Sequence, residues 1–96
     1  MLVKTTATAQ AVLIVLNEKG LHTRPSTELV KCASLFSSKI RLFYRNFEVN
    51  CKSLLEILML AAGKGARIEI KAVGDDAEEA VDTILNLSRK KFNIKY

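Results

Sequence analysis

The sequence has 96 residues, enough for one domain with a single two-layer core and too few for two independently folded units. Its 49% hydrophobic and 26% charged residues exclude the composition of a disordered chain, and no apolar run approaches the ~20 residues that span a membrane. With 15 Lys and Arg against 10 Asp and Glu, the net charge of +5 suits either nucleic acid or acidic protein partners.

The N-terminal part of the chain divides at residue 10. Residues 1–9 are small and polar, and we interpret them as an extension whose order the sequence leaves open. They lack the apolar stretch of a secretory signal, so we expect a cytoplasmic protein. Residues 10–96 are predicted to form the domain, in which the apolar, β-branched residues 10–16 indicate a buried first strand and residues 17–20 a turn.

The next stretch, Gly20–Thr27, reads Gly-Leu-His-Thr-Arg-Pro-Ser-Thr and holds the only histidine and the only proline of the chain. Proline suits the first turn of a helix, so Pro25 predicts a helix start with His22 just outside it. A helix end favours a neutral imidazole and then the anion formed on it, because free backbone N–H groups and Arg24 point toward it. The stretch therefore predicts a phosphoryl-accepting site at His22.

Other chemistries at this histidine are less well supported by the sequence. A histidine beside a helix start is generally more often a cap or a surface residue than a nucleophile. One histidine and the two separated cysteines Cys32 and Cys51 do not supply the usual ligands of zinc, and no Ser-His-Asp triad is indicated. We therefore predict no metal and no other cofactor, and we expect both cysteines to be reduced thiols.

A helix followed by a hairpin is expected next. Apolar residues at helical spacing predict a helix from Pro25 to about Phe36. The alternation in residues 39–44 predicts a half-buried strand, which a tight turn at Arg45-Asn46 joins to a short strand over residues 47–50. Asparagine tolerates the positive φ that such turns require.

Ser53 begins a second predicted helix, which extends to about Ala62 and is ended by two glycines. Ser53 and Glu56 have the spacing of a capping box, which gives the serine a structural role. The helix is apolar on more sides than can face one sheet. With Ile57 and Leu60 assigned to the core, three residues are predicted to form a partner-docking patch: Leu54, Leu55 and Leu58.

The strongest strand signal is the alternation over residues 66–73, and Asp76 with Glu79 is predicted to cap a last helix that ends near Arg89. The order of elements is therefore β-α-β-β-α-β-α. This order predicts an α+β domain with helices on one face of an antiparallel sheet.

Two segments resemble one known family. Gly20–Thr27 is similar to the active-site signature of HPr, the histidine-containing phosphocarrier of the bacterial phosphotransferase system. Lys52-Ser53-Leu54-Leu55, followed by Ile57 and Leu60-Ala61, is similar to the regulatory-serine segment of the same family. Two motifs in the family's order and spacing are far more specific than either motif alone, and the resemblance spans residues 10–87.

The resemblance implies a two-layer open-faced sandwich, with three helices on one face of a four-stranded antiparallel sheet in the order 1-4-2-3. It implies that Nδ1 of His22 accepts a phosphoryl group from enzyme I, which phosphoenolpyruvate charges, and that the group passes to IIA-type domains. Arg24 would neutralise the phosphoryl group, with backbone N–H groups of Thr23 and Arg24 nearby, and Pro25 would set the helix start. The protein would be a monomeric, stoichiometric carrier and not an enzyme.

The resemblance further implies regulation by phosphorylation of Ser53, with a serine kinase and phosphorylase as partners, although Glu56 would crowd a phosphoserine. Residues 58–65 resemble the nitrogen-branch carrier of the same family, which stays an alternative to the sugar branch. From another class, a basic nucleic-acid-binding module would fit the charge. The 6% aromatic content and the lack of an RNP-like motif argue against it.

Overall fold

The structure is a computed structural model that describes residues 7–96, so residues 1–6 of the predicted extension lie outside the described residues. Its four strands form one antiparallel sheet in the order β1-β4-β2-β3. The strands are β1 (Thr8–Ile14), β2 (Lys39–Tyr44), β3 (Phe47–Asn50) and β4 (Arg67–Val73). The helices are α1 (Thr23–Ala33), α2 (Leu54–Met59) and α3 (Ala77–Arg89), followed by a single turn, η1 (Lys91–Asn93). The predicted α+β class, element order and strand order are confirmed.

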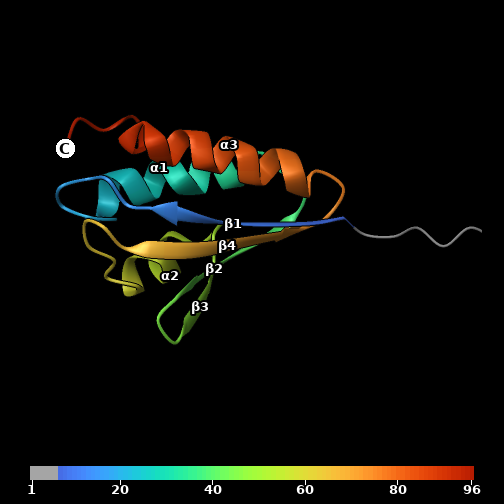
Figure 1. Ribbon diagram of the computed structural model, residues 1–96, viewed down its shortest axis with the longest axis horizontal. Helices are drawn as coiled ribbons and strands as arrows, with labels where there is room; N and C mark the ends of the chain where they lie inside the picture. Colours follow the sequence, from blue (N-terminus) through green and yellow to red (C-terminus); the bar gives the residue numbers. More distant parts are fainter. Residues whose placement is uncertain (1–6) are drawn as a thin grey trace, which may run out of the picture.

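Helices α1 and α3 lie side by side along the sheet (Figure 1), and α2 is in contact with α1. Every second side chain of the central strands is buried, as alternation along a strand requires. Leu42 of β2 lies opposite Ile70 of β4, which lies opposite Ala11 of β1. The core therefore sits between the sheet and the helices. Among the described residues, no helix is long and apolar enough to cross a membrane.

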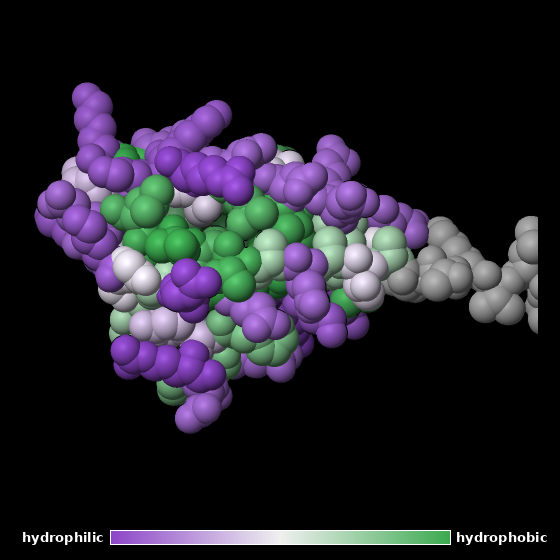
Figure 2. Space-filling model, viewed as in Figure 1, coloured by the Kyte–Doolittle hydropathy of each residue, from purple (hydrophilic) through white to green (hydrophobic). Residues whose placement is uncertain are grey.

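Strand β1 differs from its prediction in bounds and in burial. It begins at Thr8, two residues before the predicted start, and ends at Ile14. Leu13 is buried, but Val12 and Leu16 are 46% and 40% exposed. Figure 2 shows apolar side chains gathered over this part of the sheet. The prediction of a buried strand was wrong, because the helices cover only one face of the sheet and β1 lies at its edge.

Helix α2 ends at Met59, three residues before the predicted end at Ala62. The chain leaves the helix through Ala61, whose φ is 50°. This turn lets the Ala62 carbonyl accept a hydrogen bond from the N–H of Leu21 (2.9 Å). The helix is therefore ended by a tertiary hydrogen bond before the glycines are reached.

The hairpin between β2 and β3 has the predicted bounds, but its left-handed residue is Arg45, with φ of 56°, and Asn46 is not in that region. The Arg45 guanidinium carbon lies 5.1 Å from the centroid of the Tyr44 ring. A cation over an aromatic face is a favourable contact, and it accompanies the unusual backbone here.

Asp76 stands at the N-cap of α3, as predicted, but its side chain does not cap the helix. Its carboxylate accepts hydrogen bonds from the Ser38 hydroxyl and from the N–H groups of Ser37 and Ser38 (2.9 Å each). The Ser38 side chain, together with these N–H groups, lowers the pKa of Asp76 to about 2. Asp76 thus ties the start of α3 to the segment that precedes β2.

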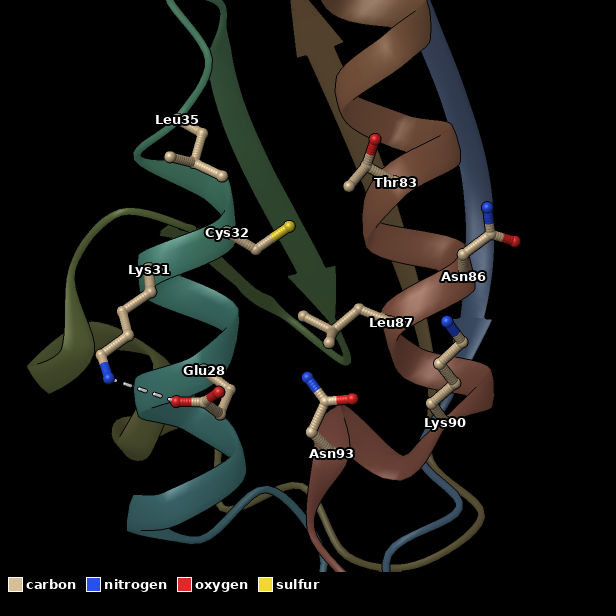
Figure 3. Close-up of a pocket in the computed structure, with 9 residues that line it drawn as sticks. All are labelled: Glu28, Lys31, Cys32, Leu35, Thr83, Asn86, Leu87, Lys90 and Asn93. Atoms are coloured by element: carbon tan, nitrogen blue, oxygen red, sulfur yellow. Dashed lines mark ion pairs between the residues drawn. The ribbon is translucent and has the colours of Figure 1, made fainter.

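A hollow of about 420 Å³ lies between α1 and α3 (Figure 3). A Glu28–Lys31 ion pair (3.4 Å) borders it, and Cys32 lines it. Both cysteines are free, and burial raises the pKa of each thiol, to about 12 at Cys51. A raised pKa disfavours the thiolate, which is the nucleophilic form of cysteine. None of the predicted site residues lines this hollow, so the site lies elsewhere.

Candidate functional site

The loop that presents His22 is fixed by buried contacts. Leu21 is buried, its N–H donates to the Ala62 carbonyl (2.9 Å), and its carbonyl accepts from the buried Ser26 hydroxyl (2.9 Å). Gly20 has φ of 72°, and a Cβ at this position would lie 2.4 Å from the Ala62 oxygen. Only glycine permits this close approach. The backbone that leads to His22 is therefore held against the segment that follows α2.

Helix α1 begins at Thr23, two residues before the predicted start, and His22 is its N-cap. The Ser26 N–H donates to the His22 carbonyl (3.0 Å), which is the first bond of the helix. Pro25 lies within the first turn, where its missing N–H has no intrahelical role, and the N–H groups of Thr23 and Arg24 have no partner within the helix. The His22 side chain makes no capping bond, and the first turn holds no acidic residue. The positive end of the helix is therefore uncompensated by its own residues.

The two nitrogens of the half-buried His22 ring are in different environments. Nε2 is buried and has no hydrogen-bond partner among the described residues. The ring also borders a surface hollow of about 360 Å³, lined by Lys19, Leu21, His22, Thr23, Leu58, Ala61, Ala62 and Gly63. Nε2 is thus inaccessible to solvent, although His22 lines a hollow that is open to solvent.

The sequence did not predict that Tyr96 lies at this site. The last residue of the sequence lies at the same end of the molecule as the start of α1 (Figure 1). Its ring stacks on the His22 imidazole, with centroids 5.7 Å apart and planes 12° from parallel. Arg24 Nη1 donates a hydrogen bond to the Tyr96 hydroxyl. The Lys19 ammonium lies 4.9 Å from the ring centroid. Tyr96 therefore contacts the histidine and two cations.

The segment after α3 is anchored so that it reaches the site. All three residues of η1 have positive φ, and the middle one, Phe92, is fully buried. The buried Asn17 side chain donates from Nδ2 to the main-chain oxygens of Lys91 and Tyr96, both at 2.9 Å. No local sequence pattern indicates these contacts, because Asn17 and Tyr96 are far apart in the chain.

Ser53 is the N-cap of α2, and its hydroxyl accepts from the Glu56 N–H (3.3 Å). The second half of the predicted capping box is absent. The Glu56 carboxylate accepts from the Asn50 N–H (3.1 Å), while the Ser53 N–H donates to the Asn50 carbonyl (3.0 Å). The Lys52 ammonium donates to the Phe36 carbonyl (2.6 Å). The Ser53 hydroxyl and N–H, at the start of α2, are therefore both paired with groups of neighbouring residues.

The predicted docking residues of α2 differ in exposure. Leu55 is 74% exposed, whereas Leu54 and Leu58 are half-buried. Met59, which the sequence reasoning left out of the patch, is 66% exposed. Leu58 lines the hollow beside His22, so the apolar residues of α2 extend to the site. Ile57 is fully buried, as predicted.

The structure brings His22, Thr23, Arg24 and Pro25 together at one helix start, with Lys19 and Tyr96 as additional site residues. Ser53 lies at the other end of α2 from Leu58, about 8 Å along the helix axis. Within the described residues, no group of three or more His, Cys, Asp or Glu could hold a metal ion. The arrangement is therefore suited to an anion formed on the imidazole.

Comparisons with known proteins point to one family. The family model described as PTS HPr component phosphorylation site matches residues 9–90. The crystal structure of HPr-C-His from Thermoanaerobacter tengcongensis is 35% identical with a TM-score of 0.87, and the match covers 92% of this chain and 99% of that chain. The phosphocarrier protein HPr from Bacillus anthracis is 35% identical with a TM-score of 0.79, over 83% and 95% of the two chains. Crh, the Bacillus subtilis catabolite repression HPr, is 30% identical with a TM-score of 0.60, over 80% and 92%.

Proposed function

Because the chain belongs to the HPr family of the phosphotransferase system, whose members are phosphoryl carriers rather than enzymes, we propose that His22 takes up the phosphoryl group. The observation that carries this proposal is that His22 occupies the N-cap position of α1 while its side chain makes no hydrogen bond to the N–H groups of the first turn. The free N–H groups of the first turn are available to the oxygens of a phosphoryl group on the ring.

The acceptor atom is Nδ1. Because Nε2 is buried, an incoming donor cannot reach it, which leaves Nδ1. In the neutral tautomer that carries its proton on Nε2, Nδ1 has a free electron pair. The Nδ1–P bond forms as the N–P bond of the donor histidine breaks, and the electron pair of the broken bond stays on the donor nitrogen. No proton needs to leave His22 before the attack.

Arg24 neutralises the negative charge on the phosphoryl oxygens. Its side chain is exposed beside His22, and its planar guanidinium offers five N–H donors in a fixed geometry. Stabilisation by a preorganised cation matters most where charge is transferred in the transition state. Pro25 fixes the backbone of the first turn, and Thr23 and Arg24 contribute N–H groups.

The proposed donor is the phosphohistidine of enzyme I, and the proposed acceptors are IIA-type domains, which dock against the exposed residues of α2 next to the site. Leu55 and Met59 provide the apolar surface, and Leu58 connects it to His22. The free thiols are consistent with exchange in the cytoplasm, where cysteines stay reduced. Phosphorylation of Ser53 would add charge at the start of this surface and so regulate docking.

The test is phosphorylation by enzyme I and phosphoenolpyruvate, followed by intact mass spectrometry and ³¹P NMR. We expect one phosphoryl group, acid-labile and base-stable, linked to Nδ1. Linkage to Nε2 or to a serine would contradict the assignment. The same assay with the enzyme I homologue of the nitrogen branch separates the two branches, since the true donor will phosphorylate the protein faster.

A further inference from the structure

Tyr96 makes contacts that the proposed function does not account for. Its hydroxyl accepts from Arg24, its ring stacks on His22, and the Lys19 ammonium and Arg24 guanidinium carbon lie 4.9 Å and 5.5 Å from the ring centroid. One side chain therefore contacts three charged or titratable groups at the start of α1.

We infer that Tyr96 is a positioning residue of the phosphoryl site, which holds the Arg24 guanidinium beside His22 until a phosphoryl group replaces the phenol. The inference rests on the proposed function of His22. Tyr96 takes no part in bond making or breaking in this role. Its hydroxyl acts through Arg24, and its stacked ring fixes the plane of the imidazole.

The hydrogen bond to Tyr96 restricts the Arg24 side chain before the phosphoryl group arrives. Arg24 is an exposed residue, and a free arginine side chain samples many rotamers, so ordering it before the reaction lowers the entropy cost of transfer. One guanidinium nitrogen is used, and the remaining N–H donors stay available for phosphoryl oxygens. A phosphoryl group carries negative charge and can accept two parallel bonds from a guanidinium, whereas the neutral phenol oxygen accepts one, so the phosphoryl group displaces the hydroxyl.

The ring also compensates a repulsion between cations. Lys19 and Arg24 both lie against Tyr96, and two like charges near one histidine would otherwise repel each other. The negative face of an aromatic ring attracts both cations. The ring therefore helps to keep both cations beside His22 before the phosphoryl group arrives.

The ring is held in place by contacts outside the site. Phe92 is fully buried, and the Asn17 side chain bonds to the main chain at both ends of the segment from Lys91 to Tyr96. The hydroxyl of Tyr96 can therefore be removed without releasing the segment.

A double-mutant cycle tests the inference. Tyr96→Phe keeps the ring and removes the acceptor of Arg24. We expect kcat/KM for phosphorylation by enzyme I to fall about fivefold, the value of one ordinary hydrogen bond. In an Arg24→Ala background the same change should have no further effect, because Tyr96 acts through Arg24. Equal losses in both backgrounds, or no loss in either, would overturn the inference.

Tyr44→Phe is the matched control, because Tyr44 also lies under an arginine but belongs to the β2–β3 hairpin. It should leave the rate unchanged. Melting temperatures of all variants exclude unfolding as the cause of a slower reaction.

NMR spectroscopy tests the contacts of Tyr96 with His22 and Arg24 without any phosphoryl transfer. The chain has one histidine, so its imidazole gives a single set of NMR signals. Tyr96→Ala should move these signals, because the ring current of the stacked ring is lost, and Tyr96→Phe should leave them nearly in place while moving the Arg24 side-chain signals. Unchanged His22 and Arg24 signals would overturn the inference. A wild-type protein that shows the expected signals but accepts no phosphoryl group would instead contradict the proposed function.

Discussion

The helices α1 and α2 begin in opposite ways. At α1 the N-cap His22 makes no side-chain capping bond, and the first turn holds no acidic residue. At α2 the N-cap Ser53 accepts from the Glu56 N–H, and Glu56 places a carboxylate in the first turn. The first helix start is open to an external anion, and the second is satisfied from within the chain.

This difference shows that a helix start can either stabilise the fold or bind an anion. A helix start that satisfies its own N–H groups contributes stability, whereas one that leaves them free can stabilise a charge that arrives later. We therefore expect changes at α1 to alter transfer and changes at α2 to alter stability or docking.

The largest effect is expected from His22→Ala, which removes the acceptor from the open helix start. Labelling by enzyme I and phosphoenolpyruvate should be lost completely, because the chain has no second histidine. Autoradiography after base treatment measures it. Residual base-stable label at another residue would contradict the proposed site, and Ser53→Ala serves as the control that keeps full labelling.

Arg24→Ala should slow transfer about a hundredfold, the usual cost of losing one preorganised stabilising group, while the fold stays intact. Arg24→Lys should recover only part of the rate, because a point charge lacks the planar donor fork. Rapid-quench kinetics with circular dichroism as the folding control measures both. Equal rates for wild type and Arg24→Ala would remove arginine from the mechanism.

At the satisfied helix start, Ser53→Ala should cost about 1 kcal/mol of folding stability and leave phosphoryl acceptance unchanged. Ser53→Asp keeps a good N-cap, so its stability should change little. Its affinity for enzyme I should fall about two- to fivefold, because an exposed charge beside Leu55 weakens docking. Titration calorimetry and thermal melting separate the two effects. If the affinity is unchanged, Ser53 is a structural cap only.

The smallest effect concerns the third helix start, where Asp76 uses its carboxylate on Ser37 and Ser38. The pKa of Asp76 is lowered from 3.8 to about 2 in the folded protein. The stability that this carboxylate contributes is therefore present above about pH 4 and is lost as the pH falls through about 2. Melting temperatures between pH 7 and pH 2 should show a flatter profile for Asp76→Asn. Parallel profiles would show that this carboxylate does not set the acid limit.

Elements with a strong local pattern were predicted well from the sequence. The strand over residues 39–44 and the end of α3 at Arg89 have the expected bounds, because alternation and helical periodicity are properties of neighbouring residues. The start of α1 was less exact. Proline is tolerated throughout the first turn, so Pro25 identified the turn and not its first residue.

Features that depend on distant residues were missed. Helix α2 ends early because Ala62 bonds to Leu21, and the Asp76 carboxylate prefers Ser38 to its own helix. Tyr96 is 72 positions from Arg24, in a tail without periodicity, so nothing local indicates that it lies at the site. Tertiary hydrogen bonds decide these cases, and a single sequence does not display them.

The exposed side of β1 has a consequence for the behaviour of the protein in concentrated solution. Its residues, Thr8 to Ile14, carry no charge, and within the described part of the chain the strand pairs with β4 alone. Uncharged edge strands tend to associate with one another, so repulsion must come from other parts of the surface. At pH 7 the net charge of +5 supplies it. Salt shortens the reach of that repulsion to about 10 Å at 0.1 M. We therefore expect association to increase as salt is added or as the pH approaches the isoelectric point.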